Sequence, residues 1–306
     1  MERSTFTNMK IRRALLFTLL IFGVSTVQVK AQLDPLSAQY FNNQYLGNPA
    51  FAGAVEGLNL YGAYRTLWNT VPGAPLTQNI TADYGFDKVG VGFSLKNESA
   101  GIQRELKVAG TYAYHLKLNE MGRQLHFGAS LGITSQSLQT GDIIGDLSDP
   151  SIGLYKERKS YLDGDVGLAY TSDHLNLQVA FPNLNGLFKK QDFRIVNQPT
   201  FFSAASYRVR LTEGQDAVGL EPKVAYRGIQ GLPNIWDAGA EMTFIDRQIL
   251  LMGLYHSSNS ATFGLGMDFK RKYLISAMYS TQTAALTGYT NGSFELNLRF
   301  TLGKHL

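Results

Sequence analysis

Hydrophobic and polar residues alternate along most of the chain. In the last such segment, 289–302, phenylalanine and leucine point to one side, while Glu295 and Asn297 point to the other. A period of two residues is typical of a β-strand with one apolar face and one polar face. Segment 102–116 repeats this pattern, whereas 248–257 is apolar on both faces, so the alternation does not orient it.

The alternation predicts about 14 strands, and most of them are long. Strands that cross a bilayer need about 9–11 residues, whereas strands of soluble proteins typically have about 5–6. An even number of strands is also what bacterial barrels of the outer membrane have. The predicted strands are 57–66, 76–86, 88–97, 102–116, 124–138, 161–171, 174–181, 200–211, 217–228, 234–245, 248–257, 260–270, 272–283 and 289–302.

The connections between these strands alternate in length. Tight polar turns occur at 87–88, 172–173, 246–248 and 271–272, and the main longer connections are 67–75, 139–160, 182–199 and 284–288. Short periplasmic turns and long outer loops are the pattern of transmembrane barrels, so both ends of the predicted barrel face the periplasm. Most prolines fall in connections, but Pro222 lies inside a predicted strand, where a β-bulge would accommodate it.

Strand length and loop asymmetry favour a membrane barrel over a soluble protein of two packed sheets. In lipid every backbone N–H and C=O needs a partner within the protein. An open sheet edge would leave a row of these groups unpaired, so the sheet has to close. The sequence therefore predicts an all-β, closed antiparallel transmembrane β-barrel.

The first 31 residues are typical of a secretory signal peptide. Lys10, Arg12 and Arg13 precede an apolar run at 14–24, and the order Val-Lys-Ala ends at Ala31. The apolar run is shorter than the about 20 residues that a membrane-spanning helix needs. We therefore expect a cleaved signal peptide at 1–31, export to a bacterial outer membrane, an N-terminal segment at 32–56 and the barrel at 57–306.

Composition agrees with this picture and excludes several functions. Only 17% of the 306 residues are charged, against about 25% in a typical soluble domain. Without the basic N-terminus the net charge of +4 becomes nearly balanced, and no basic patch indicates a nucleic-acid partner. The absence of cysteine excludes disulfides, thiolate metal sites and a cysteine nucleophile.

The polar face of each predicted strand lines the lumen with charges of both signs. Rings of one sign would indicate an ion-selective pore, whereas mixed charges favour pairs across the lumen or with a plug. The predicted lining includes Glu105, Lys107, Asp163, Asp165, Arg208, Arg210, Glu221, Lys223, Arg227, Asp237, Glu241, Asp268, Glu295 and Arg299.

Motifs for catalysis or cofactor binding are absent from the sequence. None of the five histidines has an HExxH spacing, and there is no GxSxG motif. His256 precedes Ser257, but a hydrolase also needs a positioned acid, which a sequence does not reveal. The acidic loop 142–149 lacks the regular ligand spacing of a calcium loop. We expect no enzyme activity, no cofactor and no metal.

The stretch 32–56 is rich in asparagine, glutamine and aromatic residues. It is too polar to face lipid and too aromatic for a plain linker, so it is interpreted as a plug-like segment inside the lumen. In the first outer loop, Trp68 accompanies Pro72, Gly73 and Pro75. A rigid loop with a large aromatic side chain suits a protein-binding site, although tryptophan also anchors barrels at the membrane interface.

The stretch 32–56 resembles the opening of the PorP/SprF family, which follows a DPxxSQYxxNxxxxNPAYAG-like run. Ala38 and Phe51 depart from the family's serine and tyrosine. A second match joins Arg65, Trp68, Gly73, Pro75 and Thr77 to an RxxW…GxPxT pattern, although Leu67 replaces a usual glutamine. The matching residues of the opening are Asp34, Pro35, Gln39, Tyr40, Asn43, Asn48, Pro49, Ala50, Ala52 and Gly53.

The resemblance implies an outer-membrane protein of type IX secretion and gliding machinery, similar in architecture to fatty-acid-transporter barrels. Such a protein binds or anchors a secreted or cell-surface protein and periplasmic secretion or motor components. Two alternatives remain open: a transporter of small hydrophobic solutes and a surface enzyme. The charged lumen lining disfavours the transporter.

Overall fold

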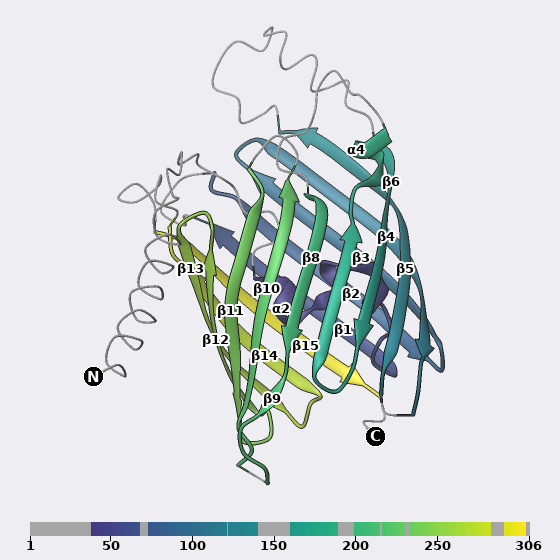
Figure 1. Ribbon diagram of the computed structural model, residues 1–306. Helices are drawn as coiled ribbons and strands as arrows, with labels where there is room; N and C mark the ends of the chain where they lie inside the picture. Colours follow the sequence, from purple (N-terminus) through teal and green to yellow (C-terminus); the bar gives the residue numbers. More distant parts are fainter. Residues whose placement is uncertain are drawn as a thin grey trace, which may run out of the picture. The chain divides into compact units, whose positions relative to one another are not determined.

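The structure is a computed structural model that describes residues 38–67, 73–120, 122–139, 160–188, 199–214, 216–229, 233–282 and 291–303 (Figure 1). The predicted signal peptide and most of loops 139–160, 182–199 and 284–288 lie outside these residues. The strands are β1 (Gly57–Leu67), β2 (Leu76–Phe86), β3 (Val89–Ala100), β4 (Gln103–Lys117), β5 (Gln124–Leu138), β6 (Tyr161–Thr171), β7 (Leu175–Phe181), β8 (Pro199–Tyr207), β9 (Val209–Arg210), β10 (Gly219–Ile229), β11 (Ile235–Phe244), β12 (Ile249–His256), β13 (Ser260–Phe269), β14 (Tyr273–Ser280) and β15 (Ser293–Leu302).

The strands form one closed antiparallel sheet. Neighbours along the chain pair with each other, and β1 pairs with β15 over ten residues, from Leu58↔Leu302 to Leu67↔Ser293. The short strand β9 and strand β8 both pair with β10, so together they form one interrupted strand of the barrel wall. Counted in this way, the fifteen strands of the described residues make the 14-stranded closed barrel that the alternation predicts.

Pro222 lies opposite the interruption between β8 and β9. The pairs Lys223↔Ser206 and Leu220↔Val209 stand on either side of the gap and share one register, so no residue is inserted there. The bulge considered from the sequence is therefore absent at Pro222. Proline has no backbone N–H to donate to a neighbouring strand, so the strand pairing is interrupted opposite Pro222. A register shift occurs instead at Gly228/Ile229.

Side chains divide cleanly between the two faces of the wall. Large apolar residues point outward, as in β13, where Phe263 and Leu265 are 59% and 60% exposed. In β12, which the sequence leaves unoriented, Leu251 is exposed while Met252 and Leu254 are buried. Both faces of β12 are apolar because its inner face packs against the N-terminal segment, residues 38–56.

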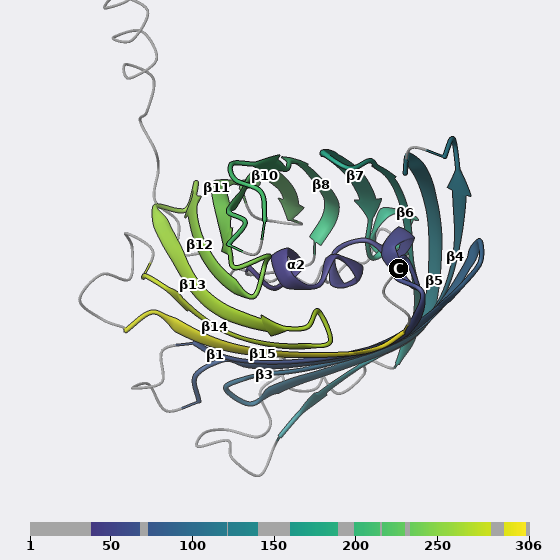
Figure 2. The ribbon, with the colours of Figure 1, turned by 90° about the horizontal axis from the view of Figure 1, so that it is seen from below.

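The N-terminal segment lies within the ring of strands (Figure 2). It contains helix α2 (Gln39–Asn42) and the 3-10 turns η1 (Gln44–Leu46) and η2 (Pro49–Phe51). A further short helix, α4 (Leu184–Phe188), follows β7. No helix in the described residues is long and apolar enough to cross a membrane.

Candidate functional site: the N-terminal segment and the inner wall

Two asparagines shape the N-terminal segment locally. The Asn43 side chain accepts a hydrogen bond from Tyr45 N at 3.1 Å and starts η1. The Asn48 side chain accepts one from Ala50 N at 3.0 Å and starts η2, where Pro49 occupies the first position. Asparagine is a preferred residue just before a helix, and proline is preferred at its first position. The Asn-Pro-Ala order thus favours this turn locally.

Aromatic residues at the start of the segment pack on the inner wall. Tyr40 and Phe41 are 2% and 7% exposed, and the Tyr40 ring lies 5.3 Å from the Phe202 ring of β8. The same buried cluster includes Met252 and Leu254 of β12. Burial of this apolar surface favours the inward position of the segment.

Polar side chains of the segment bond to strands around the wall. Tyr40 Oη donates to Asp237 Oδ2 of β11 at 2.8 Å. Asn42 Nδ2 donates to Ser276 Oγ of β14 at 2.6 Å. These two bonds fix the first turn of the segment to one part of the barrel.

Further bonds lead to other strands. Asn43 Nδ2 donates to Thr81 Oγ1 of β2 at 2.8 Å, and Tyr45 Oη donates to Thr111 Oγ1 of β4 at 2.6 Å. Burial raises the pKa of Tyr45 to about 12, so its hydroxyl stays a neutral donor at physiological pH. Bonds thus reach β2, β4, β11 and β14 from the six consecutive residues 40–45 of the segment.

The last part of the segment lies against four inward-facing glycines, Gly85, Gly90, Gly128 and Gly167, which we call the glycine seat. A Cβ added at Gly90 would lie 1.9 Å from Ala52 O, and one at Gly85 would lie 2.2 Å from Gly53 O. The other two distances are 2.3 Å, from Gly128 to Pro49 C, and 1.9 Å, from Gly167 to Asn48 Oδ1. At Gly85, Gly90 and Gly128 a side chain would collide with the backbone of the segment, and at Gly167 it would collide with the Asn48 side chain.

Asn48 and Gly53 hold the segment in this seat. Asn48 Nδ2 donates to the carbonyls of Leu168 on β6 and Val179 on β7, at 3.2 and 3.3 Å. Gly53 N donates to Asp83 Oδ2 of β2 at 3.0 Å. Asp83 is a lumen charge that the predicted lining omits, although its parity within 76–86 matches that of the buried Asn79 and Thr81.

Asp237 is the centre of a buried polar network. Arg227 Nη2 donates to Asp237 Oδ1 at 2.7 Å, and His256 Nδ1 lies 2.6 Å from the same oxygen. His256 Nε2 lies 2.7 Å from Thr262 Oγ1, which is 2.6 Å from Ser280 Oγ. Arg227, Asp237 and Thr262 are each at most 1% exposed.

The order Asp237, His256, Thr262 is that of an acid, a base and a hydroxyl. A working triad needs a hydroxyl that a substrate can reach, whereas Thr262 is buried and bonded to Ser280. The Asp237 charge is also balanced by Arg227. Ser257, the serine next to His256 in sequence, accepts a bond from Trp236 N at 3.0 Å. The arrangement stabilises the wall, and its Asp237 carboxylate accepts the hydrogen bond from Tyr40 Oη.

Other charges expected in the lumen form ion pairs. Lys107 Nζ lies 3.4 Å from Asp163 Oδ2 and 3.0 Å from Asp165 Oδ1. The Asp163 and Asp165 carboxylates also accept bonds from the backbone N–H groups of Asn185 and Asn183, beside α4. This cluster ties β4 and β6 to the start of the next connection.

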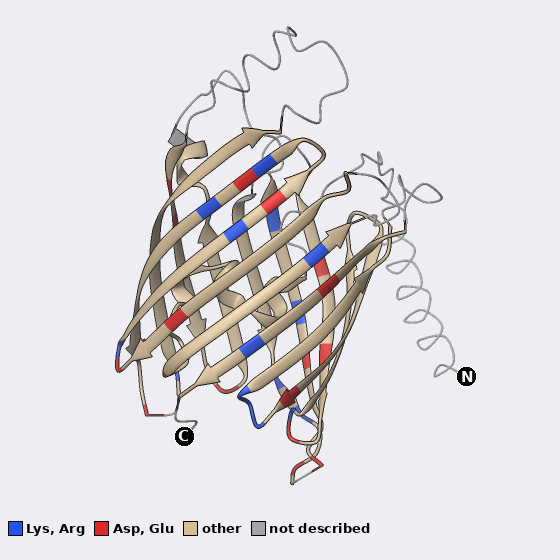
Figure 3. Cartoon of the chain, turned by 180° about the vertical axis from the view of Figure 1, so that it is seen from behind, with Lys and Arg blue, Asp and Glu red and all other residues tan. Residues whose placement is uncertain are grey.

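A second group of expected charges pairs elsewhere along the inner wall. Glu221 lies 3.2 Å from Arg208 Nε and 3.8 Å from Lys223 Nζ. Arg299 Nη2 pairs with Asp268 at 2.5 Å. Charges of both signs intersperse along the strands (Figure 3).

The remaining expected charges differ in their surroundings. Glu105 accepts a bond from Gln136 at 2.7 Å, and Glu295 accepts one from Asn297 at 3.1 Å. Glu241 is half-buried, whereas Arg210 is exposed on β9. A pair that the sequence analysis missed joins Lys96 to Glu98 at 2.6 Å.

Two histidines that the predicted lumen lining omits lie beside the glycine seat. His115 Nδ1 is 2.8 Å from His126 Nδ1, and His115 Nε2 is 3.1 Å from Ala52 O. The Phe51 ring stacks on His126 at 5.8 Å. Across the described residues, no group of three or more histidine, cysteine or acidic side chains is placed to hold a metal ion.

Part of the expected site lies outside the described residues: Asp34, Pro35, Trp68 and Pro72. The stem of the first outer loop is described. Leu67 N donates to Pro75 O at 2.9 Å, and Gly101 N donates to Gly73 O at 2.8 Å. The loop between β1 and β2 is therefore fastened to the neighbouring turn between β3 and β4.

Residues 29–300 match a protein family described as type IX secretion system membrane protein PorP/SprF. Among solved structures, the toluene transporter TbuX of Ralstonia pickettii is similar, with a TM-score of 0.51 and 12% identity over 90% of this chain and 96% of that chain. Omp33 of Acinetobacter baumannii has a TM-score of 0.48 and 9% identity, over 82% of this chain and 100% of that one. No curated protein matches significantly. At these identities the TbuX likeness shows the fold alone.

Proposed function

The chain belongs to the PorP/SprF family of type IX secretion system membrane proteins, and we propose that it acts there by binding protein partners, with its N-terminal segment as a plug in the lumen. The family and the barrel fold place it in the outer membrane. The proposed partners are a secreted or cell-surface protein on the outer side and secretion or motor components in the periplasm. Residues 1–31 are removed as a signal peptide on export.

The glycine seat is the observation that carries this proposal. Glycines on β2, β3 and β5 admit the backbone of 49–53 at distances that a side chain would block, and Gly167 on β6 admits the Asn48 side chain. So close a fit between the segment and the wall supports the proposal that the segment is a permanent part of the barrel. A barrel filled in this way presents its loops and turns as binding surfaces.

A transporter of small hydrophobic solutes is the second candidate, and the fold likeness to TbuX is what favours it. Such a solute would need an apolar path through the lumen. The apolar inner patch that includes Met252 and Leu254 is instead covered by Tyr40 and Phe41. The charged side chains of the inner wall form ion pairs with one another, as Lys107 does with Asp163.

The same reasoning supports a role without catalysis. The arrangement of Asp237, His256 and Thr262 is buried and lacks a free hydroxyl. We expect the purified protein to hydrolyse no lipid, peptide or glycan. Reproducible turnover that is abolished by His256→Ala would overturn this part of the proposal.

Deletion of the gene for this chain in its native bacterium distinguishes the two candidate functions. We expect export or surface attachment of type IX cargo to be lost, while uptake of toluene, as an apolar probe, stays unchanged. Re-expression of the wild-type chain should restore export. Normal export with impaired toluene uptake would favour the transporter and contradict partner binding.

A further inference from the structure

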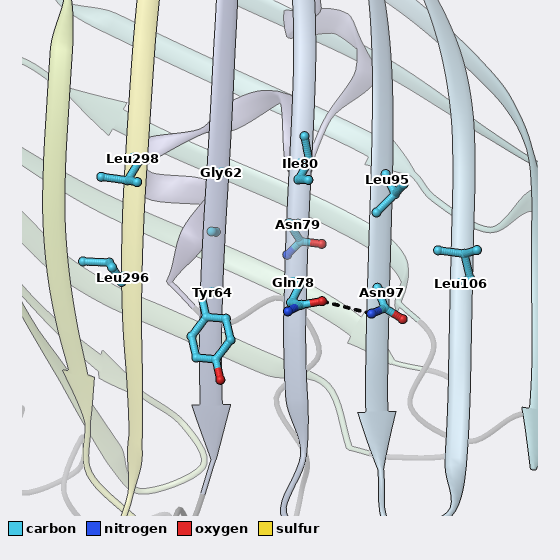
Figure 4. Close-up of a pocket in the computed structure, with 11 residues that line it drawn as sticks. Gly62, Tyr64, Gln78, Asn79, Ile80, Leu95, Asn97, Leu106, Leu296 and Leu298 are labelled. Carbon is cyan, nitrogen blue, oxygen red and sulfur yellow. Dashed lines mark hydrogen bonds between the residues drawn. The ribbon is translucent and has the colours of Figure 1, made fainter. Parts of the chain in front are cut away.

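A hollow of about 570 Å³ lies on the outward face of the barrel wall (Figure 4). Its volume is within the range of ligand pockets, about 300–1,000 Å³. It lies over β15, β1, β2, β3 and β4, where strand residues are direct neighbours. We call it the outer hollow and define it by Gly62, Ile80, Leu95, Leu298, Gln78 and Asn97.

A missing side chain creates the outer hollow. Leu298, Gly62, Ile80 and Leu95 are successive cross-strand partners and form one row on the outward face. At Gly62 an added Cβ would meet no atom within 4 Å. The row therefore has a gap between Leu298 and Ile80, which are 51% and 53% exposed.

Two amides form the polar side of the hollow. Gln78 and Asn97 are cross-strand partners in the next row toward the loop end, and Asn97 Nδ2 donates to Gln78 Oε1 at 3.0 Å. Within the described part of the chain, this bond leaves the Gln78 N–H groups and Asn97 Oδ1 for another partner. An amide that faces hydrocarbon is costly unless it is hydrogen-bonded.

The hollow therefore offers an apolar recess beside the Gln78 N–H groups and the Asn97 side-chain oxygen, on a surface that the outer membrane surrounds. An amide-linked acyl chain matches this set. Its methylene groups fit the recess over Gly62, its carbonyl accepts from Gln78 Nε2, and its N–H donates to Asn97 Oδ1. An ester-linked chain lacks that N–H and leaves the Asn97 oxygen unpaired.

We propose that the outer hollow binds lipid A, through one of its amide-linked acyl chains. Gln78 lies two residues from the start of β2, at the end of the barrel that carries the long connections. With these connections outside the cell, the hollow faces the outer leaflet, where lipid A resides. The site is separate from the lumen and from the proposed partner role.

Native mass spectrometry of the purified, delipidated barrel with added lipid A tests the proposal. We expect wild type to retain lipid A, and Gly62→Leu, which fills the recess, to retain it several-fold less. Gly110→Leu is the matched control, because Gly110 also faces outward with no atom within 4 Å of an added Cβ. It should retain lipid A as wild type does.

A second comparison uses phosphatidylethanolamine, whose chains are ester-linked. Wild type should prefer lipid A, and the double variant Gln78→Leu/Asn97→Leu should lose that preference. All variants should show the heat-modifiable migration of a folded barrel. Equal retention of lipid A by Gly62→Leu and wild type would overturn the proposal, and so would equal binding of the two lipids by wild type. It would also be overturned if Gly62→Leu abolished association of two barrels and left lipid A retention unchanged.

Discussion

At the scale of single residues, four inward glycines and one buried aspartate decide how the N-terminal segment is held. The alternation of residues predicts that Asp237 faces the lumen, and the structure adds that it bonds to Arg227, His256 and Tyr40. Alternation assigns a residue to a face but does not say what approaches that face. The glycine seat was therefore invisible in the sequence, since alternation places Gly128 on the inward face but does not show that Pro49 lies against it.

Substitution of a seat glycine should displace the segment. In Gly90→Ala the new Cβ would lie 1.9 Å from the backbone oxygen of Ala52, so we expect residues 38–56 to become sensitive to protease in the folded barrel. Limited proteolysis with mass spectrometry of the fragments measures this. Gly253→Ala, where an added Cβ meets no atom within 4 Å, is the control. Equal protection of the segment in both variants would speak against the seat.

Removal of the central carboxylate should destabilise the barrel strongly. Asp237→Ala removes the carboxylate that pairs with the fully buried Arg227, and breaking a buried ion pair costs about 3–5 kcal/mol. The urea concentration at which heat-modifiable migration is lost reports the change. Asp246→Ala removes an exposed pair with Arg271, which is worth about 0–1 kcal/mol. Similar midpoints for the two variants would contradict the structural role of Asp237.

At the scale of strands and loops, the sequence predicts most of the barrel wall. β5 and β6 begin and end where the alternation places them, because the outward face is apolar from Leu125 to Ile133 in β5 and from Leu162 to Tyr170 in β6. Segment 200–211 is the exception, since Pro222 on the neighbouring strand interrupts its pairing and divides it into β8 and β9. A single strand's pattern does not reveal a defect in its partner.

Orientation in the membrane follows from the connections and can be measured by labelling. The chain has no cysteine, so Ser148→Cys and Asp173→Cys each create a unique site. We expect an impermeant maleimide to label position 148, in a long loop, in intact cells, and to label 173, in a tight turn, only after lysis. The reverse pattern would show that the barrel is inverted.

The first outer loop is the proposed contact site for a partner on the cell surface. Its stem is fastened through Gly73 and Pro75, so Trp68 follows an ordered strand end. We expect Trp68→Ala to reduce cargo export or attachment with normal amounts of heat-modifiable barrel. If a fall in folded barrel accounts for the whole defect, the tryptophan serves only as a membrane anchor.

At the scale of the whole molecule, the barrel and its N-terminal segment form a single packed structure. Hydrogen bonds from Tyr40, Asn43 and Asn48 reach strands that are distant in sequence. The composition of 32–56 predicts a segment that suits neither lipid nor water. Its path along the wall depends on contacts such as Ala52 with Gly90, which pair residues with no local sequence signal.

Conductance of the purified barrel in a planar lipid bilayer tests most directly whether the lumen is closed by this segment. Wild type should show little or no current, because residues 38–53 bond to β2, β4, β6 and β11 across the lumen. A variant that lacks 38–53, folded by its heat-modifiable migration, should open stable channels. Equal conductance of the two proteins, whether high or absent, would contradict the closure of the lumen by the N-terminal segment.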